Sequence, residues 1–364
     1  MILINILIPF ILVFILLYTA YRSRKNKTIK NNNWHIRTNC KYLMPETLQT
    51  VLNEINKFYK TLYMPCTYQN IDKEYEDFEV DKKGIYFLID GINILIAKQH
   101  LYKVILMEYG IKNTEKLFPK TWIIEEDKKK FIKDFDKDKI YIIKKNVQRQ
   151  NGLKIYNDLD KILSHFDEQG EYPSVVVQEL LQNPYLIDGR KINLRVYVLA
   201  TKIKDNFNIY VYNDGFMYYT AEKFIPNSLD PKVNITTGYV DRNIYKVNPL
   251  THQDFRQYLI KHHDEKTADL CFNNMYDLIK KIFGVFLKKI GNIDKLYNNL
   301  KFQLFGVDIA IDNQFNAKIM EVNKGPDLGG KDKRDSDLKH NMVRNMLNIV
   351  KLCKLDVDNN FIKL

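Results

Sequence analysis

One stretch constrains the fold of this chain more than any other: residues 301–323, which read KFQLFGVDIAIDNQFNAKIMEVN. It divides into two mostly apolar segments, 302–312 and 317–323, with a polar turn between them. Each segment has the length of a β-strand, and a loop of about four residues is an ordinary hairpin connection. The sequence therefore predicts an antiparallel hairpin in which Asp312 pairs with Ala317.

This register brings oxygen-bearing side chains to one face of the hairpin. It places Asp308 across from Glu321. It also places Gly306 across from Asn323, and side chains two positions apart on a strand point the same way. Opposed carboxylates repel each other, but a hard cation reverses that sign, and two carboxylates with an amide suit Mg²⁺. Asp308, Glu321 and Asn323 are therefore candidate Mg²⁺ ligands, and a solvated sheet rim is the alternative.

The composition indicates a folded, basic protein. The 364 residues are 45% hydrophobic and 13% aromatic, which suffices for two or three packed subdomains. The net charge of +12 favours acidic partners, although heavy use of Lys, Asn and Ile throughout the chain explains it equally well. We expect no nucleic-acid partner, because the sequence has no RNA-binding signature or zinc-ligand spacing. Four dispersed cysteines indicate reduced thiols.

Residues 1–21 form an uncharged apolar segment, MILINILIPFILVFILLYTAY. A helix of this length spans roughly the 30 Å hydrocarbon core of a bilayer. Lysines and arginines follow between positions 22 and 30, which predicts a single-pass anchor with the catalytic body in the cytoplasm. A cleaved signal peptide is the alternative, but its positive N-terminal region is absent.

Two segments in the middle of the chain predict buried strands. Residues 139–144 are β-branched and aromatic and deliver Lys144 into a polar loop that contains Gly152. Such a loop could close over phosphate oxygens, although an ordinary surface loop is equally consistent with the pattern. Residues 174–180 form the second strand.

A third strand is predicted over residues 191–202, where polar and apolar residues alternate. Lys191, Asn193 and Arg195 share one face, and the planar guanidinium of Arg195 suits a phosphoryl or carboxylate group. A solvent-facing strand would show the same pattern. Other expected elements are helices at 45–60, 272–289 and 335–352, strand at 84–97, a hairpin over 208–220 with a type I′ turn at Asp214-Gly215, and a polar loop at 234–237.

Together these segments resemble the tubulin–tyrosine ligase-like family, whose members have an ATP-grasp fold. The resemblance runs from about Phe118 to Leu328, and its most specific pieces are residues 177–195 and 302–326. It implies an α/β (α+β) architecture in which antiparallel sheets sandwich a nucleotide. The expected domains are a transmembrane anchor (1–21), a basic juxtamembrane segment with a small N-terminal lobe (22–115), an ATP-grasp ligase domain (116–355) and a C-terminal tail (356–364).

The resemblance also implies a chemistry, that of an ATP-dependent carboxylate–amine ligase working through an acyl phosphate. It implies that Arg195 and Lys144 act on the phosphoryl group and that Asp308, Glu321 and Asn323 hold Mg²⁺. The residues implied to bind ATP are Lys144, the adenine hinge Gln178, Glu179, Leu180 and Leu181, then Lys191, Asn193 and Thr236.

The chain departs from the family pattern at several positions. A lid glycine is Lys154 here, a frequent aspartate is Asn193, and the last residue of a His-Leu-Thr-Asn motif is Thr237. The family's arginine after the Asp-Gly pair is Tyr218. Because that arginine helps to bind the amino acid in family members, its replacement bears on substrate identity more than on ATP binding.

The expected function is therefore a membrane-anchored ligase that uses ATP and Mg²⁺. It would add a free amino acid (glutamate, glycine or tyrosine) to an acidic protein tail, with tubulin as the expected acceptor. Two alternatives remain: an ATP-grasp ligase for a non-tubulin substrate, and a weakly active nucleotide-binding adaptor at a membrane.

Overall fold

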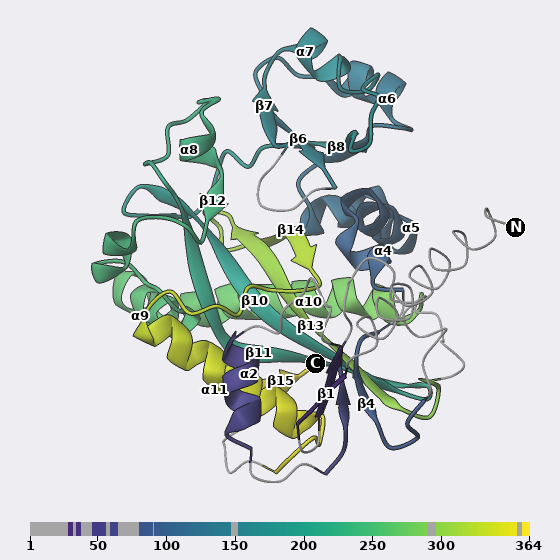
Figure 1. Ribbon diagram of the computed structural model, residues 1–364. Coiled ribbons are helices and arrows are strands. Elements are labelled where there is room, and N and C mark those ends of the chain that lie inside the picture. Colours follow the sequence, from purple (N-terminus) through teal and green to yellow (C-terminus); the bar gives the residue numbers. More distant parts are fainter. Residues whose placement is uncertain are drawn as a thin grey trace, which may run out of the picture.

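The computed structural model describes residues 28–31, 34–37, 46–55, 59–64, 80–89, 91–146, 152–289, 296–354 and 359–364. Within these ranges the chain forms a mixed α+β structure built on a large and a small sheet (Figure 1). The large sheet runs in the order β1 (Thr28–Asn31), β2 (Trp34–Arg37), β3 (Leu62–Tyr63), β4 (Ile85–Phe87), β13 (Leu300–Ile311), β10 (Arg190–Ile203), β11 (Asn206–Thr220) and β12 (Thr236–Thr237). Off this path, β14 (Ala317–Asn323) pairs with β13, β15 (Phe361–Lys363) with β11, and β9 (Leu186–Ile187) with β10.

The small sheet runs in the order β5 (Thr121–Ile123), β8 (Ser174–Glu179), β6 (Tyr141–Lys145) and β7 (Lys154–Tyr156), with antiparallel pairing throughout. The helices of the described ranges are α2 (Glu46–Asn53), α4 (Asn93–Ile96), α5 (Lys98–Leu117), α6 (Lys128–Asp134), α7 (Leu159–Leu163), α8 (Pro231–Asn234), the 3₁₀ helix η1 (Arg242–Lys246), α9 (His252–His262), α10 (Glu265–Leu287) and α11 (Lys333–Ile349).

Strand β10 lies at the centre of the large sheet, and its alternating side chains define two faces. Leu194 and Val196 pack into the larger core with residues of α5, α9 and α10. Tyr197 and Leu199 pack into a second core with residues of α2 and α11. Figure 1 shows α2 and α11 against one face of this sheet and α10 behind it. Arg195 lies two residues before Tyr197, so it projects from the face that α11 covers farther along the strand.

The small sheet has its own aromatic core. Trp122, Phe131 and Tyr141 are fully buried, with edge-to-face rings whose centroids lie 5.1–5.9 Å apart, under α6 and α7. On its other face, Ile142 and Ile155 form an apolar cluster that includes Ile235 from the segment between α8 and β12. The small sheet thus turns an apolar face toward the large sheet, and Figure 1 shows it at one end of the molecule, beyond β12 and β14.

The predicted strands at 139–144, 174–180 and 191–202 are confirmed as β6, β8 and β10, and the two C-terminal helices as α10 and α11. The strand predicted over 84–97 is wrong beyond its first residues. Among the described residues of this stretch only Ile85–Phe87 is strand, paired with the start of β13, and Gly91 at φ 73° leads into α4. A left-handed backbone at this glycine ends any extended run.

The type I′ turn predicted at Asp214-Gly215 is also wrong. Both residues lie inside the continuous strand β11, and neither has the positive φ that such a turn needs. The ladder with β10 is interrupted there, since Val196 pairs with Gly215 and Val198 with Val211. Asp214 Oδ1 accepts the backbone N–H groups of Gly215 (2.8 Å) and Gln253 (3.2 Å), so contacts with α9 hold this irregular strand.

The predicted anchor at residues 1–21 lies outside the described residues, as do residues 147–151 of the predicted phosphate loop. Among the helices that the structure does describe, none combines the length and the apolar character needed to cross a bilayer.

Candidate active site

The predicted pairing of the carboxylates is confirmed. Asp308 on β13 lies directly across from Glu321 on β14, and Gly306 lies across from Asn323. Since paired residues point to the same side of a sheet, the two carboxylates and the amide share one face.

The register nearer the turn differs from the prediction. A bulge after Asp308 shifts the ladder by one residue, so Ile311 rather than Asp312 pairs with Ala317. Asp312 Oδ1 instead accepts the backbone N–H groups of Gln314 (2.9 Å) and Asn316 (2.8 Å) and closes the turn. The bulge lies next to the carboxylates, a common place for an irregularity that re-aims a functional side chain.

Arg195 joins β10 to this hairpin. It pairs with Asp308 across the β10–β13 ladder, with Nε 2.8 Å from Oδ1 and Nη2 donating to Oδ2 at 3.0 Å. A Cβ on Gly306 would lie 2.5 Å from Arg195 Nη1, so only glycine leaves room for the guanidinium. Burial and the charge of Glu321 raise the pKa of Asp308 to about 6 despite Arg195 and Lys144.

Two lysines face the same carboxylates. Lys98, the first residue of α5, places Nζ 3.1 Å from Glu321 Oε1. Lys144 on β6 is only 8% exposed and makes no hydrogen bond or ion pair with any residue that the structure describes. Burial and the charge of Lys98 lower the pKa of Lys144 to about 8, while Glu321 and Asp308 oppose that shift. Three cations therefore surround two carboxylates, and this excess of positive charge suits phosphate.

The oxygen set at this face fits a hard divalent cation. Asp308 Oδ1 is buried, and its contact with Arg195 Nε at 2.8 Å is an ion pair without hydrogen-bond geometry, which leaves this oxygen able to bind a cation. Over the described ranges, no group of three or more His, Cys, Asp or Glu side chains is placed to hold a metal. A metal here would therefore take two carboxylates and one amide, with phosphate and water completing its shell, as Mg²⁺ prefers.

The predicted hinge, at the end of β8 and just beyond it, offers a distinct kind of site. Gln178 Nε2 donates to Thr121 Oγ1 (2.9 Å), and that hydroxyl in turn donates to the carbonyl of Pro119 (2.7 Å). This chain of donors fixes the amide orientation, and it leaves the buried Gln178 Oε1 without a partner among the described residues. Gln178 pairs with Ile142, so it points toward the apolar cluster of the small sheet. An open acceptor beside aliphatic side chains fits the amino edge of adenine.

The backbone of the hinge is partly engaged by neighbours. The N–H of Glu179 donates to Lys120 O (2.9 Å) and that of Leu180 to Ile140 O (2.8 Å). Leu181 O accepts from Lys191 Nζ at 2.9 Å. In this hinge Gln178 is therefore the clearest open acceptor.

The other predicted ATP ligands, Lys191, Asn193 and Thr236, lie on the large sheet, on β10 and β12. Lys191 Nζ also donates to Asn234 Oδ1 (2.8 Å), and burial lowers the pKa of this lysine to about 8. Asn193 follows two residues later on β10, and Thr236 pairs with Thr220 at the edge of the sheet. Lys191 thus connects the predicted hinge to α8, just before β12.

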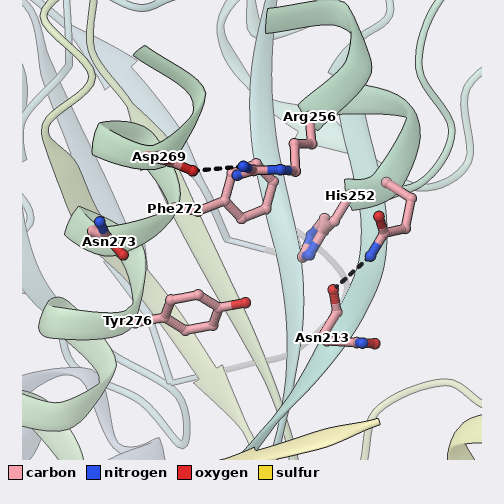
Figure 2. Close-up of a pocket in the computed structure, with 8 residues that line it drawn as sticks. Asn213, His252, Arg256, Asp269, Phe272, Asn273 and Tyr276 are labelled. Atoms are coloured by element: carbon pink, nitrogen blue, oxygen red, sulfur yellow. Dashed lines mark hydrogen bonds and ion pairs between the residues drawn. The ribbon is translucent and has the colours of Figure 1, made fainter. Parts of the chain in front are cut away.

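A pocket of about 200 Å³ lies elsewhere, between α9, α10 and β11. Figure 2 shows Arg256 beside Phe272 and facing Asp269, with His252, Asn213 and Tyr276 around them. Arg256 donates to Asp269 Oδ1 at 2.5 Å. None of the predicted site residues lines this pocket.

Comparison with known proteins agrees with this geometry. The model of the tubulin-tyrosine ligase family matches residues 86–359, about three quarters of the chain. The chain belongs to the tubulin-tyrosine ligase family. The match spans all the residues placed at the candidate site above, from Lys98 on α5 to Asn323 on β14.

Several curated relatives are tubulin polyglutamylases by name. The probable tubulin polyglutamylase TTLL9 of Rattus norvegicus is 32% identical over 194 residues, which are 50% of this chain and 40% of the relative. The probable tubulin polyglutamylase ttll-9 of Caenorhabditis elegans is 26% identical over 311 residues (81% of this chain, 70% of the relative). The probable beta-tubulin polyglutamylase of Tetrahymena thermophila is 28% identical over 285 residues (71% and 23%). The chain thus spans well under half the length of the rat relative.

Within this family, the chain's departures lie at the edge of the site. Tyr218, at the arginine position, stacks near Arg195, with the guanidinium carbon 5.0 Å from the ring centroid. Asn193 keeps its place on β10, and Lys154 is exposed at the start of β7. None of these three residues belongs to the group formed by Asp308, Glu321 and Lys144.

Sequence reasoning missed Lys98. This residue lies in no motif that the sequence alone singles out, and 223 residues separate it from Glu321. Its position at the start of a long helix was the available signal, but the preceding segment was interpreted as strand.

Proposed function

We propose that this chain is an ATP-grasp ligase that joins glutamate to a carboxylate of an acidic protein tail, with tubulin as the acceptor. The observation that carries the proposal is the carboxylate pair of Asp308 and the partly exposed Glu321, with Lys98, Lys144 and Arg195 around it from three other elements. Family membership and the names of the polyglutamylase relatives support the choice of reaction and amino acid.

The residues divide the work of phosphoryl transfer. Bound Mg²⁺ would neutralise phosphate charge, held by Asp308, Glu321 and Asn323. Lys144 and Lys98 would orient the phosphates, and Gln178 Oε1 would accept a hydrogen bond from the adenine amino group. Such a site contributes mainly positioning and preorganised charge.

The bond changes proposed for the reaction balance. A carboxylate oxygen of the acceptor attacks the γ-phosphorus of ATP, ADP leaves, and an acyl phosphate forms. The neutral amine of the amino acid then attacks the acyl carbon and forms the C–N bond. The bond from that carbon to the bridging oxygen breaks, inorganic phosphate leaves with the bridging oxygen, and the nitrogen loses one proton to water. Arg195 would hold the phosphoryl oxygens in both steps; the position of its Nη1 next to Gly306, beside the carboxylates, supports this role.

Electrostatics supports the acidic acceptor. The net charge of +12 attracts a polyanionic tail at long range and speeds its encounter. Glycine and tyrosine are the other candidate amino acids. Because Tyr218 stands where family members have an arginine that helps to bind the amino acid, an amino acid other than glutamate is a specific alternative.

We also propose that residues 1–21 anchor the chain to a membrane, with the ligase domain in the cytoplasm. The support is the uncharged apolar run followed by basic residues. Membrane fractionation of the full chain and of a chain that begins at residue 31 tests this: we expect only the full chain to stay in the membrane after a carbonate wash. Equal recovery of both in the soluble fraction would contradict it.

The reaction is tested by incubating the protein with Mg·ATP, isotope-labelled amino acids and tubulin, followed by mass spectrometry of the tubulin tails. We expect labelled glutamate on tubulin. Labelling of another acceptor in a cell extract, with none on tubulin, would favour a ligase for a different substrate. Tight ATP binding without hydrolysis or transfer would favour a nucleotide-binding adaptor.

A further inference from the structure

A group formed by two tyrosines and a lysine lies beside Arg195. Tyr218 stacks on Arg195, and the next residue in space is Gly238, whose Cβ, if present, would lie 2.8 Å from the Tyr218 ring and 3.3 Å from Lys331 Nζ. Lys331 Nζ donates to Gly238 O and lies 3.9 Å from the ring centroid of Tyr239. Two tyrosine rings and one ammonium therefore form a corner next to the reacting centre.

The other cations of this corner are already neutralised. Arg195 pairs with Asp308, Arg242 with Asp332, and Lys339 with Asp335 at 2.6 Å. Lys331 makes no ion pair with any described residue. Asp327 acts on it electrostatically from outside ion-pair distance, and Asp327 Oδ1 accepts the N–H of Gly329 (2.9 Å).

The ammonium of the exposed Lys331 is open to an anionic ligand. Its one hydrogen bond goes to a backbone carbonyl, which leaves donors of a lysine unused. Phosphate is already served by Lys98, Lys144 and Arg195 around the hairpin. A single cation flanked by aromatic rings suits a carboxylate carried on an aliphatic stem.

We propose that Lys331 binds a carboxylate of the reacting partners and so determines which substrate is accepted. This inference rests on the proposed ligase function. The carboxylate has two sources with the same chemistry: the incoming amino acid, or an acidic residue of the acceptor beside the modified one. Tyr218 and Tyr239 shape the corner, and Gly238 keeps it open, since a side chain there would strike the Tyr218 ring.

The test compares Lys331→Met with Lys331→Arg and with the matched control Lys333→Met. Lys333 lies two residues away on α11, is exposed, and pairs only with Asp337. Steady-state kinetics of the full chain would vary glutamate, acceptor peptide and ATP separately. We expect Lys331→Met to raise KM for one carboxylate substrate about 10- to 100-fold, the usual effect of losing a charge-assisted hydrogen bond, with KM for ATP unchanged. Lys331→Arg should recover most of that loss.

The pattern identifies the source of the carboxylate. A raised KM for glutamate alone assigns the amino acid, and a raised KM for the acceptor alone assigns the tail. If Lys331→Met has the same KM for glutamate as the wild type, and also the same KM for the acceptor, the inference is overturned while the ligase function stands. Absence of any ATP-dependent transfer by the wild-type chain would overturn the ligase function, and this inference with it.

Discussion

The two ends of the proposed nucleotide site are built on opposite physical principles. At the phosphate end, charged groups lie together: Arg195 pairs with Asp308 and Lys98 with Glu321, and the buried Lys144 lies within electrostatic range of both carboxylates. At the adenine end, Gln178 presents one open acceptor beside aliphatic side chains from the small sheet. Removing an interaction that is stronger in the transition state than in the ground state lowers kcat. Removing one that is equally strong in both states raises KM instead. The phosphate end should therefore govern kcat and the adenine end KM for ATP.

The largest effect is expected from Asp308→Asn. It removes a metal ligand and leaves the buried guanidinium of Arg195 without its ionic partner. We expect kcat to fall about 10³-fold and the free energy of unfolding by about 3 kcal/mol. Urea denaturation and the tubulin transfer assay measure the two effects. Asp337→Asn, at an exposed pair with Lys333, should leave both within error.

A smaller loss should follow from Gly306→Ala. The new methyl would meet Arg195 Nη1 and Pro326 Cβ, at 2.5 and 2.9 Å, so the guanidinium must shift. Because positioning errors of this size cost about 10- to 100-fold, kcat should fall by that factor with KM for ATP little changed. In the control Gly284→Ala, the added methyl meets nothing within 4 Å on α10, and the protein should keep full activity. Unchanged kcat in Gly306→Ala would separate Arg195 from the chemistry.

The charge state of Lys144 should make ATP binding depend on pH. Its lowered pKa of about 8 means that the ammonium is present at pH 7 and lost as the pH rises through 8. We expect the Kd for Mg·ATP to rise about tenfold between pH 7 and pH 9, because the neutral amine of Lys144 must take up a proton when ATP binds. Calorimetry in buffers of different ionisation enthalpy measures both. Lys144→Arg should flatten the profile, and an equally steep profile in that variant would assign the titration to another group.

The smallest effect is expected at the adenine end. Gln178→Leu removes the open acceptor and puts an apolar side chain of similar size opposite Ile142. KM for ATP should rise about three- to tenfold with kcat retained, because one neutral hydrogen bond is lost. The preference for ATP over GTP should narrow as well, since the lost acceptor recognises the adenine amino group. A large fall in kcat would break the proposed division between the two ends.

The parts of the site that sequence predicts well are those set by local periodicity. Alternation along two strands and a short turn were enough to place Asp308 opposite Glu321, and alternation alone placed Arg195 on the correct face. The domain boundaries predicted at 21, 115 and 355 stay predictions. The anchor concerns residues outside the described ranges.

The parts that sequence missed depend on contacts between distant segments. Asp214-Gly215 has the composition of a tight turn, but the N–H of Gln253 on α9 and the close approach of Arg195 O to Gly215 hold it within a strand. The bulge after Asp308 leaves no periodic signal. Lys98 reaches Glu321 only because α5 packs beside β14, which no local pattern reveals.

The central claim is that Asp308 and Glu321 bind the metal of a metal–nucleotide complex. Titration of ATP into wild-type protein and into Glu321→Gln, with and without Mg²⁺, tests it most directly, because Glu321 is partly exposed and its loss should leave the fold intact. We expect Mg²⁺ to tighten ATP binding to the wild type, and we expect both this gain and amino-acid transfer to vanish in Glu321→Gln. A variant that keeps its Mg²⁺ dependence and its transfer activity would contradict the account.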